Sequence, residues 1–198
     1  MYDFLIKRYR SAGNELIHRS LEISTKIGWN EDILECIWST MDAKWLAFYF
    51  TDSTISSYTE FLLLYLVAEH LEDWTPESNS ITENVKSALY ALCDRYISLE
   101  ERRLPILCYA TKIERKISTM AICYNQADII WRKIYDVSSD INFYTKRLIL
   151  GAILYNLFLS LSKNTINKEE YYLQIDRGLA KARTFAKYKS MMKTAFHI

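Results

Sequence analysis

Apolar residues recur every three to four positions along most of the chain, and short polar clusters separate these periodic runs. This spacing places the apolar side chains on one face of an α-helix, because a helix turns once in 3.6 residues. The pattern therefore predicts seven to eight helices joined by short connections. Their expected ranges are 2–27, 30–50, 58–73, 81–97, 119–137, 141–162 and 168–196, with one more around Pro105, which lies in its first turns or kinks it.

Several predicted helix starts carry a capping signal, a small polar residue followed three positions later by glutamate. In such a box the two side chains satisfy backbone N–H groups that the first turn leaves without partners. The first predicted helix ends at Gly28, and Asn30 begins the second, with Glu31 and Asp32 at its positive end. The four predicted boxes are Ser57 with Glu60, Ser80 with Glu83, Ser98 with Glu101, and Asn167 with Glu170.

Two predicted helices are apolar on nearly every face, over residues 61–68 and 148–161. A helix without a polar face is covered by other helices, so these segments predict the centre of a compact bundle. The alternative, a helical-repeat superhelix, is disfavoured because a stacked row of repeats has no such centre. The longer run has 14 residues, fewer than the roughly 20 that cross a bilayer, so no membrane span is expected. The residues expected in the core are Leu63, Leu66, Val67, Leu150, Ile153, Leu154 and Leu157.

The composition supports an all-α fold in one domain. The chain has 198 residues, of which half are hydrophobic and a quarter are charged, which suits a single hydrophobic core over residues 1–198. It contains only four glycines and two prolines. Sheet proteins use these residues in their many tight turns, so their scarcity favours long helices.

The four cysteines, Cys36, Cys93, Cys108 and Cys123, form no C-x-x-C pair and lie in mostly apolar contexts. A chain of this size folds without disulfide cross-links, so reduced, buried thiols are expected. The first residues also lack the order of a secretory signal, because their charges follow a very short apolar run. Together these features predict a cytoplasmic protein.

The charge is distributed unevenly although the net charge is only +1. Residues 177–198 contain six basic residues and no acid, whereas residues 1–176 carry a net charge of −5. The basic residues are spread around the whole circumference of the predicted helix 168–196, whereas a nucleic-acid-binding helix concentrates them on one face. We therefore expect this helix to pack on the bundle. If it binds nucleic acid instead, its phosphate-binding candidates are Lys187, Lys189 and Lys193.

His18 is the most suggestive candidate for metal chemistry, because Glu15 and Glu22 lie one turn on either side of it. The Glu-x-x-His spacing occurs in di-iron helical bundles, but such a site needs a second Glu-x-x-His and two further glutamates. The other histidines, His70 and His197, are not preceded by glutamate at that spacing. We therefore expect a surface histidine, with no metal and no cofactor.

No catalytic residue is predicted. The sequence contains no G-x-S-x-G motif, and its four glycines lie too far apart for a phosphate-binding loop. Cys36 lies beside Glu35 and Cys93 lies beside Asp94, and an adjacent acid raises the pKa of a thiol and disfavours a nucleophile. All-helical enzymes often lack linear motifs, so the enzyme question stays open, with the sequence favouring a protein that is not an enzyme.

The most unusual feature of the composition is its aromatic content of 14%, with fifteen tyrosines and five tryptophans. In the predicted second helix one face carries a recurring stripe of Trp38, Met41, Trp45 and either Phe48 or Tyr49. Such a stripe belongs to the core, or alternatively to a groove that binds a partner helix.

These observations lead to a ranked set of functions. The first is a non-catalytic helical module that binds another protein, such as a regulator, adaptor, chaperone or immunity-type protein, because aromatic residues anchor interfaces. The alternative is a helical-bundle enzyme or a binder of a small molecule or cofactor, with an interior aromatic pocket near the first two helices. A nucleic-acid binder that uses the basic helix comes third, and self-association into a homo-oligomer is left open. The candidate binding residues are Trp38, Trp45, Tyr49, His18, Glu15 and Glu22.

Overall fold

A computed structural model describes the backbone of residues 2–40, 54–138, 141–163 and 167–195. It describes the side chains of residues 14–39, 54–138, 142–163 and 167–185. Within these ranges the protein is all-α and has no strand, as predicted. The eight α-helices are α1 (Tyr2–Ile27), α2 (Asp32–Thr40), α3 (Ile55–His70), α4 (Ile81–Ser98), α5 (Leu104–Ala110), α6 (Lys116–Lys133), α7 (Ile141–Leu161) and α8 (Lys168–Ala195), with short 3₁₀ helices at Glu100–Arg103 and Ile113–Arg115.

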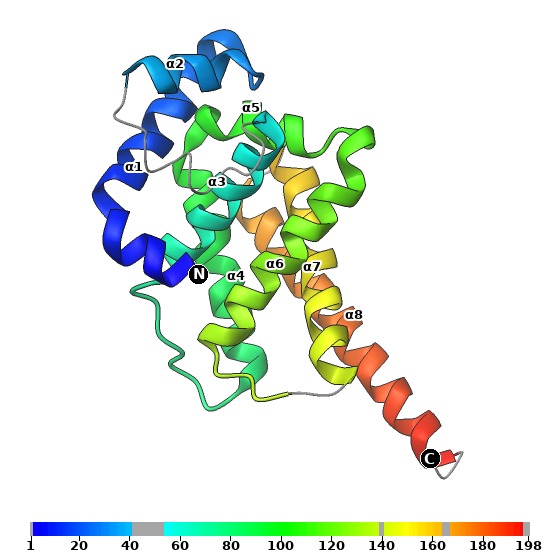
Figure 1. The fold of residues 1–198 in the computed structure, drawn as a ribbon. Coiled ribbons are helices and arrows are strands. Elements are labelled where there is room, and N and C mark those ends of the chain that lie inside the picture. Colours follow the sequence, from blue (N-terminus) through cyan, green and yellow to red (C-terminus); the bar gives the residue numbers. More distant parts are fainter. Residues whose placement is uncertain (1, 41–53, 139–140, 164–166, 196–198) are drawn as a thin grey trace.

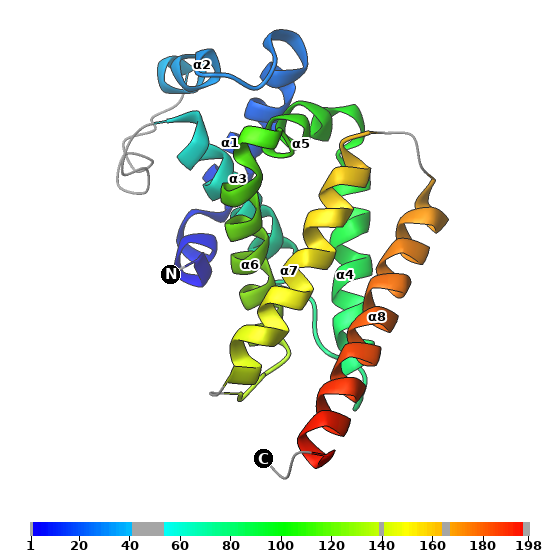
Figure 2. The same ribbon diagram turned by 90° about the vertical axis from the view of Figure 1, so that its right-hand side faces the viewer.

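The helices form a bundle in which α6 and α7 pack as an antiparallel pair (Figure 1). The helix α3 lies against α6, and α8 packs along both α4 and α7 (Figure 2). On the other side of the molecule α1 packs against α2 and α3. The four helices α4, α6, α7 and α8 thus form one layered group, which contains the candidate site described below.

Local capping chemistry explains where several helices begin and end. Ser80 caps α4 by accepting a hydrogen bond from the backbone N–H of Glu83, and the N–H of Glu170 donates to Asn167 Oδ1 over 2.9 Å. Both predicted boxes therefore mark true helix starts. Gly28 ends α1 with a φ of +80°, a conformation that glycine adopts without steric conflict.

Two predicted helix starts are wrong. The helix α3 begins three residues earlier than Ser57 predicts, because Thr54 is the residue whose side chain caps it. Ser98 is the last residue of α4 and does not cap a new helix. The chain turns after it through Glu100, which has a φ of +52°, and enters a 3₁₀ turn before α5.

The predicted core is confirmed, since all seven of its residues are buried. The first residue of the apolar run in α7 is not buried, however, because Leu148 is 61% exposed to solvent. The helices α6 and α7 come unusually close at Gly151, where an added Cβ atom would lie 3.2 Å from the backbone nitrogen of Tyr124. Among the described residues, no helix has both the length and the apolar content needed to span a bilayer.

Candidate ligand pocket

A pocket of about 220 Å³ lies among α4, α6, α7 and α8, and we call it the ligand pocket. Helix α6 contributes one residue to its wall, and the other three helices contribute the rest. The lining residues are Ile81, Thr82 and Val85 of α4, Trp131 of α6, Lys146, Ile149, Leu150 and Ile153 of α7, and Leu179, Ala182 and Arg183 of α8.

The pocket has an apolar floor and a more polar rim. Val85, Leu150 and Leu179 are all less than a tenth exposed, so the inner surface consists of buried aliphatic side chains. At the rim Ile81 is 57% exposed and the Arg183 side chain is 59% exposed. Small-molecule sites combine a mainly apolar wall with a few polar groups in this way.

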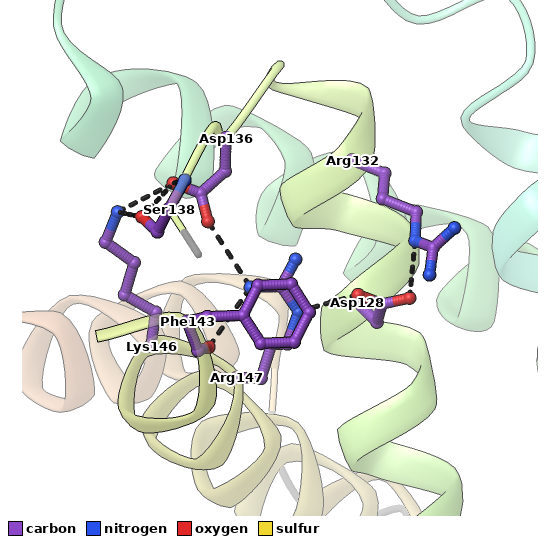
Figure 3. Close-up of polar contacts among 7 residues, drawn as sticks. All are labelled: Asp128, Arg132, Asp136, Ser138, Phe143, Lys146 and Arg147. Carbon is purple, nitrogen blue, oxygen red and sulfur yellow. Dashed lines mark hydrogen bonds and ion pairs between the residues drawn. The ribbon is translucent and has the colours of Figure 1, made fainter. Parts of the chain in front are cut away.

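A cluster of charged side chains with a buried centre lies beside the pocket and holds the start of α7 on the end of α6 (Figure 3). Its centre is Arg147, whose side chain is only 1% exposed. Arg147 Nε donates to Asp128 Oδ1 over 2.6 Å, and its Nη1 donates to the Phe143 carbonyl over 3.1 Å and to Asp136 Oδ2 over 3.3 Å. Burial of a charge is unfavourable unless it is paired and hydrogen-bonded, and here both conditions hold. We call this cluster the Arg147 network, and it comprises Asp128, Arg132, Asp136, Ser138, Phe143, Lys146 and Arg147.

Asp136 holds together the part of the Arg147 network that lies nearest the pocket. Its Oδ1 accepts hydrogen bonds from Lys146 Nζ over 2.7 Å and from Ser138 Oγ over 2.6 Å. Burial alone would raise the pKa of this carboxyl group, but the hydrogen bonds from Lys146, Ser138 and Arg147 outweigh it and lower the pKa to about 2. Asp136 is therefore ionised at neutral pH.

Lys146 belongs both to the Arg147 network and to the wall of the ligand pocket. Its ammonium group lies 5.1 Å from the ring centroid of Trp131, within the range of a cation–π contact. Because Asp136 and Ser138 hold the same ammonium group, the network fixes the position of a cation at the edge of an apolar pocket.

A second set of contacts holds α8 on α4 and so places the α8 side of the pocket. The rings of Tyr90 and Tyr172 stack with their centroids 3.8 Å apart. Ion pairs of 2.9 Å lie on either side of the stack, one between Lys86 and Asp176 and one between Lys168 and Asp94. The buried residues of α8 include Tyr171, Ile175 and Leu179. We call these contacts between α4 and α8 the tyrosine ladder, which consists of Lys86, Tyr90, Asp94, Lys168, Tyr172 and Asp176.

The structure does not bring the predicted candidates around His18 into one site. His18 is exposed on α1. Glu15 pairs with Arg19 over 2.9 Å, and Glu22 lies 3.8 Å from Lys26. In the part of the chain that the structure describes, no three side chains of His, Cys, Asp or Glu are grouped so that they could hold a metal ion.

The aromatic stripe and the basic candidates are described only in part. Trp38 is 47% exposed on α2 and does not line the ligand pocket. The other aromatic and basic candidates, Trp45, Tyr49, Lys187, Lys189 and Lys193, have side chains outside the described residues.

The buried cysteines are not nucleophiles. Burial raises the pKa of the Cys93 thiol to about 12 and also raises that of Cys123, so neither thiol is ionised at neutral pH.

Sequence reasoning missed both sets of contacts that shape the pocket. The tyrosine ladder does leave a signal, because the pattern K-x-x-x-Y-x-x-x-D occurs twice, at residues 86–94 and 168–176. Two antiparallel helices with this pattern bring each lysine opposite an aspartate and the two tyrosines together. The Arg147 network leaves no comparable signal, since Arg147 is one of many basic residues until the α6–α7 pairing is known.

Comparison with known proteins changes the ranking of functions. None of the curated proteins matches the chain. Residues 118–186 match the model of the COQ9 family, whose members are lipid-binding proteins of coenzyme Q biosynthesis. The prediction of a protein-interaction module is therefore wrong, and its alternative, a binder of a small molecule or cofactor, fits better. That alternative expected an aromatic pocket near the first two helices, whereas the pocket found lies among α4, α6, α7 and α8 and has one aromatic residue in its wall. Over about a third of its length, from α6 to α8, the chain is thus similar to the COQ9 family.

Proposed function

We propose that this protein binds a lipid of coenzyme Q biosynthesis in the ligand pocket. One observation carries the proposal. Eight of the eleven residues that line the pocket, Trp131 to Arg183 in chain order, lie inside the segment that is similar to the COQ9 family. The pocket and the family similarity therefore share three helices, α6, α7 and α8.

The size and the surface of the pocket suit part of such a lipid. An engineered apolar cavity of about 150 Å³ binds benzene, so a pocket of about 220 Å³ accommodates a six-membered ring or a short length of isoprenoid chain. The exposed rim allows the rest of a longer molecule to extend outside. Burial of apolar ligand surface contributes roughly 25 cal/mol for each Å² removed from water, and the aliphatic floor supplies that contact.

The proposal concerns binding and includes no reaction. We also propose a cytoplasmic location, which the free thiols of Cys93, Cys108 and Cys123 support. Cys93 and Cys123 are buried as expected, whereas Cys108 is exposed.

Native mass spectrometry with farnesol, a neutral isoprenoid alcohol, tests the proposal. The blocking variant is Ala182→Phe, because Ala182 lines the pocket and a phenyl ring there would fill it. Ala180→Phe is the matched control, because Ala180 lies on the same helix, is exposed and is not part of the wall.

The wild-type protein and Ala180→Phe should each retain one farnesol per chain, and Ala182→Phe should lose most of the complex. If the wild-type protein retains no farnesol, the proposal is contradicted. Equal retention by all three proteins would also contradict it, because the ligand would then bind elsewhere.

A further inference from the structure

The polar side chains in the wall of the ligand pocket are almost all hydrogen-bond donors. Lys146 and Arg183 are cations that only donate, and the indole N–H of Trp131 also only donates. The hydroxyl of Thr82 is the single side-chain oxygen in the wall. A pocket that holds only hydrocarbon needs no charged group, so these donors indicate that the ligand carries acceptor atoms.

Lys146 and Arg183 are each paired with one carboxylate, Asp136 and Glu83, and each keeps N–H donors for a ligand. The Lys146 ammonium has three N–H donors, and the structure assigns one to Asp136 and one to Ser138. Asp136 does not line the pocket, and its charge is shared with Arg147. Across the Arg147 network three cations face two carboxylates, so the cluster is positive overall.

Arg183 is held even less firmly. Arg183 forms an ion pair with Glu83, at 3.6 Å between side chains that are 59% and 55% exposed. Water screens a pair of this kind, which contributes little, and a guanidinium group keeps further N–H donors for a ligand. Glu83 itself is not part of the wall.

Each donor-bearing segment of the wall lies one helical turn from a buried apolar residue: Lys146 precedes Leu150 in α7, and Arg183 follows Leu179 in α8. Ile81 and Thr82 form the first turn of α4, and Arg183 reaches that turn through its pair with Glu83. The N-terminal end of a helix carries a partial positive charge, which adds to the charge of Lys146 and Arg183. The side chains of Val85, Leu150 and Leu179 are buried and form the apolar part of the wall.

From this arrangement we infer that the ligand is amphipathic, with its apolar part against the floor and an anionic carboxylate or phosphate head at Lys146 and Arg183. The inference rests on the proposed function, since it concerns the ligand of the same pocket. It narrows the proposed ligand to a lipid with an acidic head. The head then accepts hydrogen bonds from Lys146 and Arg183, while the tail gains the apolar contact.

Two pairs of probes that differ only in the head test the inference at pH 7.5. The carboxylate pair is 4-octylbenzoate and 4-octylbenzyl alcohol, and the phosphate pair is farnesyl phosphate and farnesol. Dissociation constants are measured for the wild-type protein, Lys146→Met and Arg183→Met. The control is Lys181→Met, because Lys181 is exposed on the same helix as Arg183 and does not line the pocket.

In at least one pair the anionic probe should bind the wild-type protein about tenfold more tightly than its neutral partner, since hydrogen bonds to charged groups are the stronger ones. The pair that shows this difference identifies the head as carboxylate or phosphate. Lys146→Met and Arg183→Met should each reduce the preference severalfold while leaving the neutral probes unchanged, and Lys181→Met should keep it. Arg183→Met makes the test independent of folding, because Arg183 lies at the exposed rim.

Equal binding of anionic and neutral probes by the wild-type protein would overturn the inference and leave the proposed function intact. A preference that persists in both Lys146→Met and Arg183→Met would also overturn it, since the head would then lie elsewhere. If none of the four probes binds, both the inference and the proposed function fail.

Discussion

Asp136→Asn is the substitution that tests the Arg147 network most sharply, because Asp136 joins three donors at the edge of the ligand pocket. The carboxylate accepts hydrogen bonds from Lys146, Ser138 and Arg147, and its side chain is only 5% exposed. Asparagine has nearly the same shape but no charge. The change therefore removes the charge while disturbing the packing little.

The expected magnitude follows from the pKa of Asp136, which is about 2 in the folded protein against a usual value of 3.8. A group whose pKa is depressed by folding stabilises the protein above its unfolded pKa, and this stabilisation is lost as the pH falls through the folded pKa. A shift of this size corresponds to about 2 kcal/mol at neutral pH. Asp136→Asn should therefore lower the free energy of unfolding by about 2 kcal/mol at pH 7, and the difference should shrink to less than about half a kcal/mol near pH 2.

Urea denaturation followed by far-UV circular dichroism at pH 7, 5, 3 and 2 measures this difference. The comparison with the wild type at each pH cancels the titration of the other carboxyl groups. Glu114→Gln is the control, because Glu114 is exposed, and it should change stability by less than about half a kcal/mol at every pH. A difference between Asp136→Asn and the wild type that is the same at pH 7 and pH 2 would refute the reasoning.

Two further substitutions test the packing that surrounds the pocket. Leu154→Ala removes a fully buried side chain of α7 and should lower the free energy of unfolding by about 2–5 kcal/mol in urea, whereas a loss below about half a kcal/mol would show that α7 is peripheral. Tyr172→Ala removes the stack on Tyr90 and the 2.8 Å hydrogen bond to Asp94. It should speed hydrogen exchange in the first half of α8 more than in α6, and equal effects on both helices would contradict the role assigned to the tyrosine ladder.

The parts of the fold that the sequence predicts are those governed by local interactions. The start of α4 is predictable because Ser80 and Glu83 lie within one turn, and a side chain that satisfies a nearby N–H leaves a pattern in the sequence. The same pattern at Ser98 falsely predicts a helix start, because α4 ends there and the chain turns through Glu100 in a left-handed conformation. The buried faces of α3 and α7 are predictable because both runs lack a polar side.

The candidate site is harder to predict from the sequence, because its parts are far apart in the chain. Val85 and Leu179 meet in one pocket only after α4 and α8 have paired, and periodicity does not specify which helices are neighbours. Trp38 and Trp131 look alike in the sequence, yet one is 47% exposed on α2 and the other lies in the pocket wall. Arg147 illustrates the same limit, because its burial depends on carboxylates 19 and 11 residues away that only the fold brings together.

Photoaffinity labelling with a farnesol analogue that carries a diazirine tests the proposed binding of a lipid most directly, because it reports the place of binding and not only its strength. After irradiation and proteolysis, the labelled peptides should come from α7 around residues 149–153 and from α8 around residues 179–183, and an excess of unlabelled farnesol should abolish the labelling. The variant Ala182→Phe should be labelled much less than Ala180→Phe. Labels confined to α1, α2 or α3, or labels that unlabelled farnesol does not displace, would contradict a lipid site among α4, α6, α7 and α8.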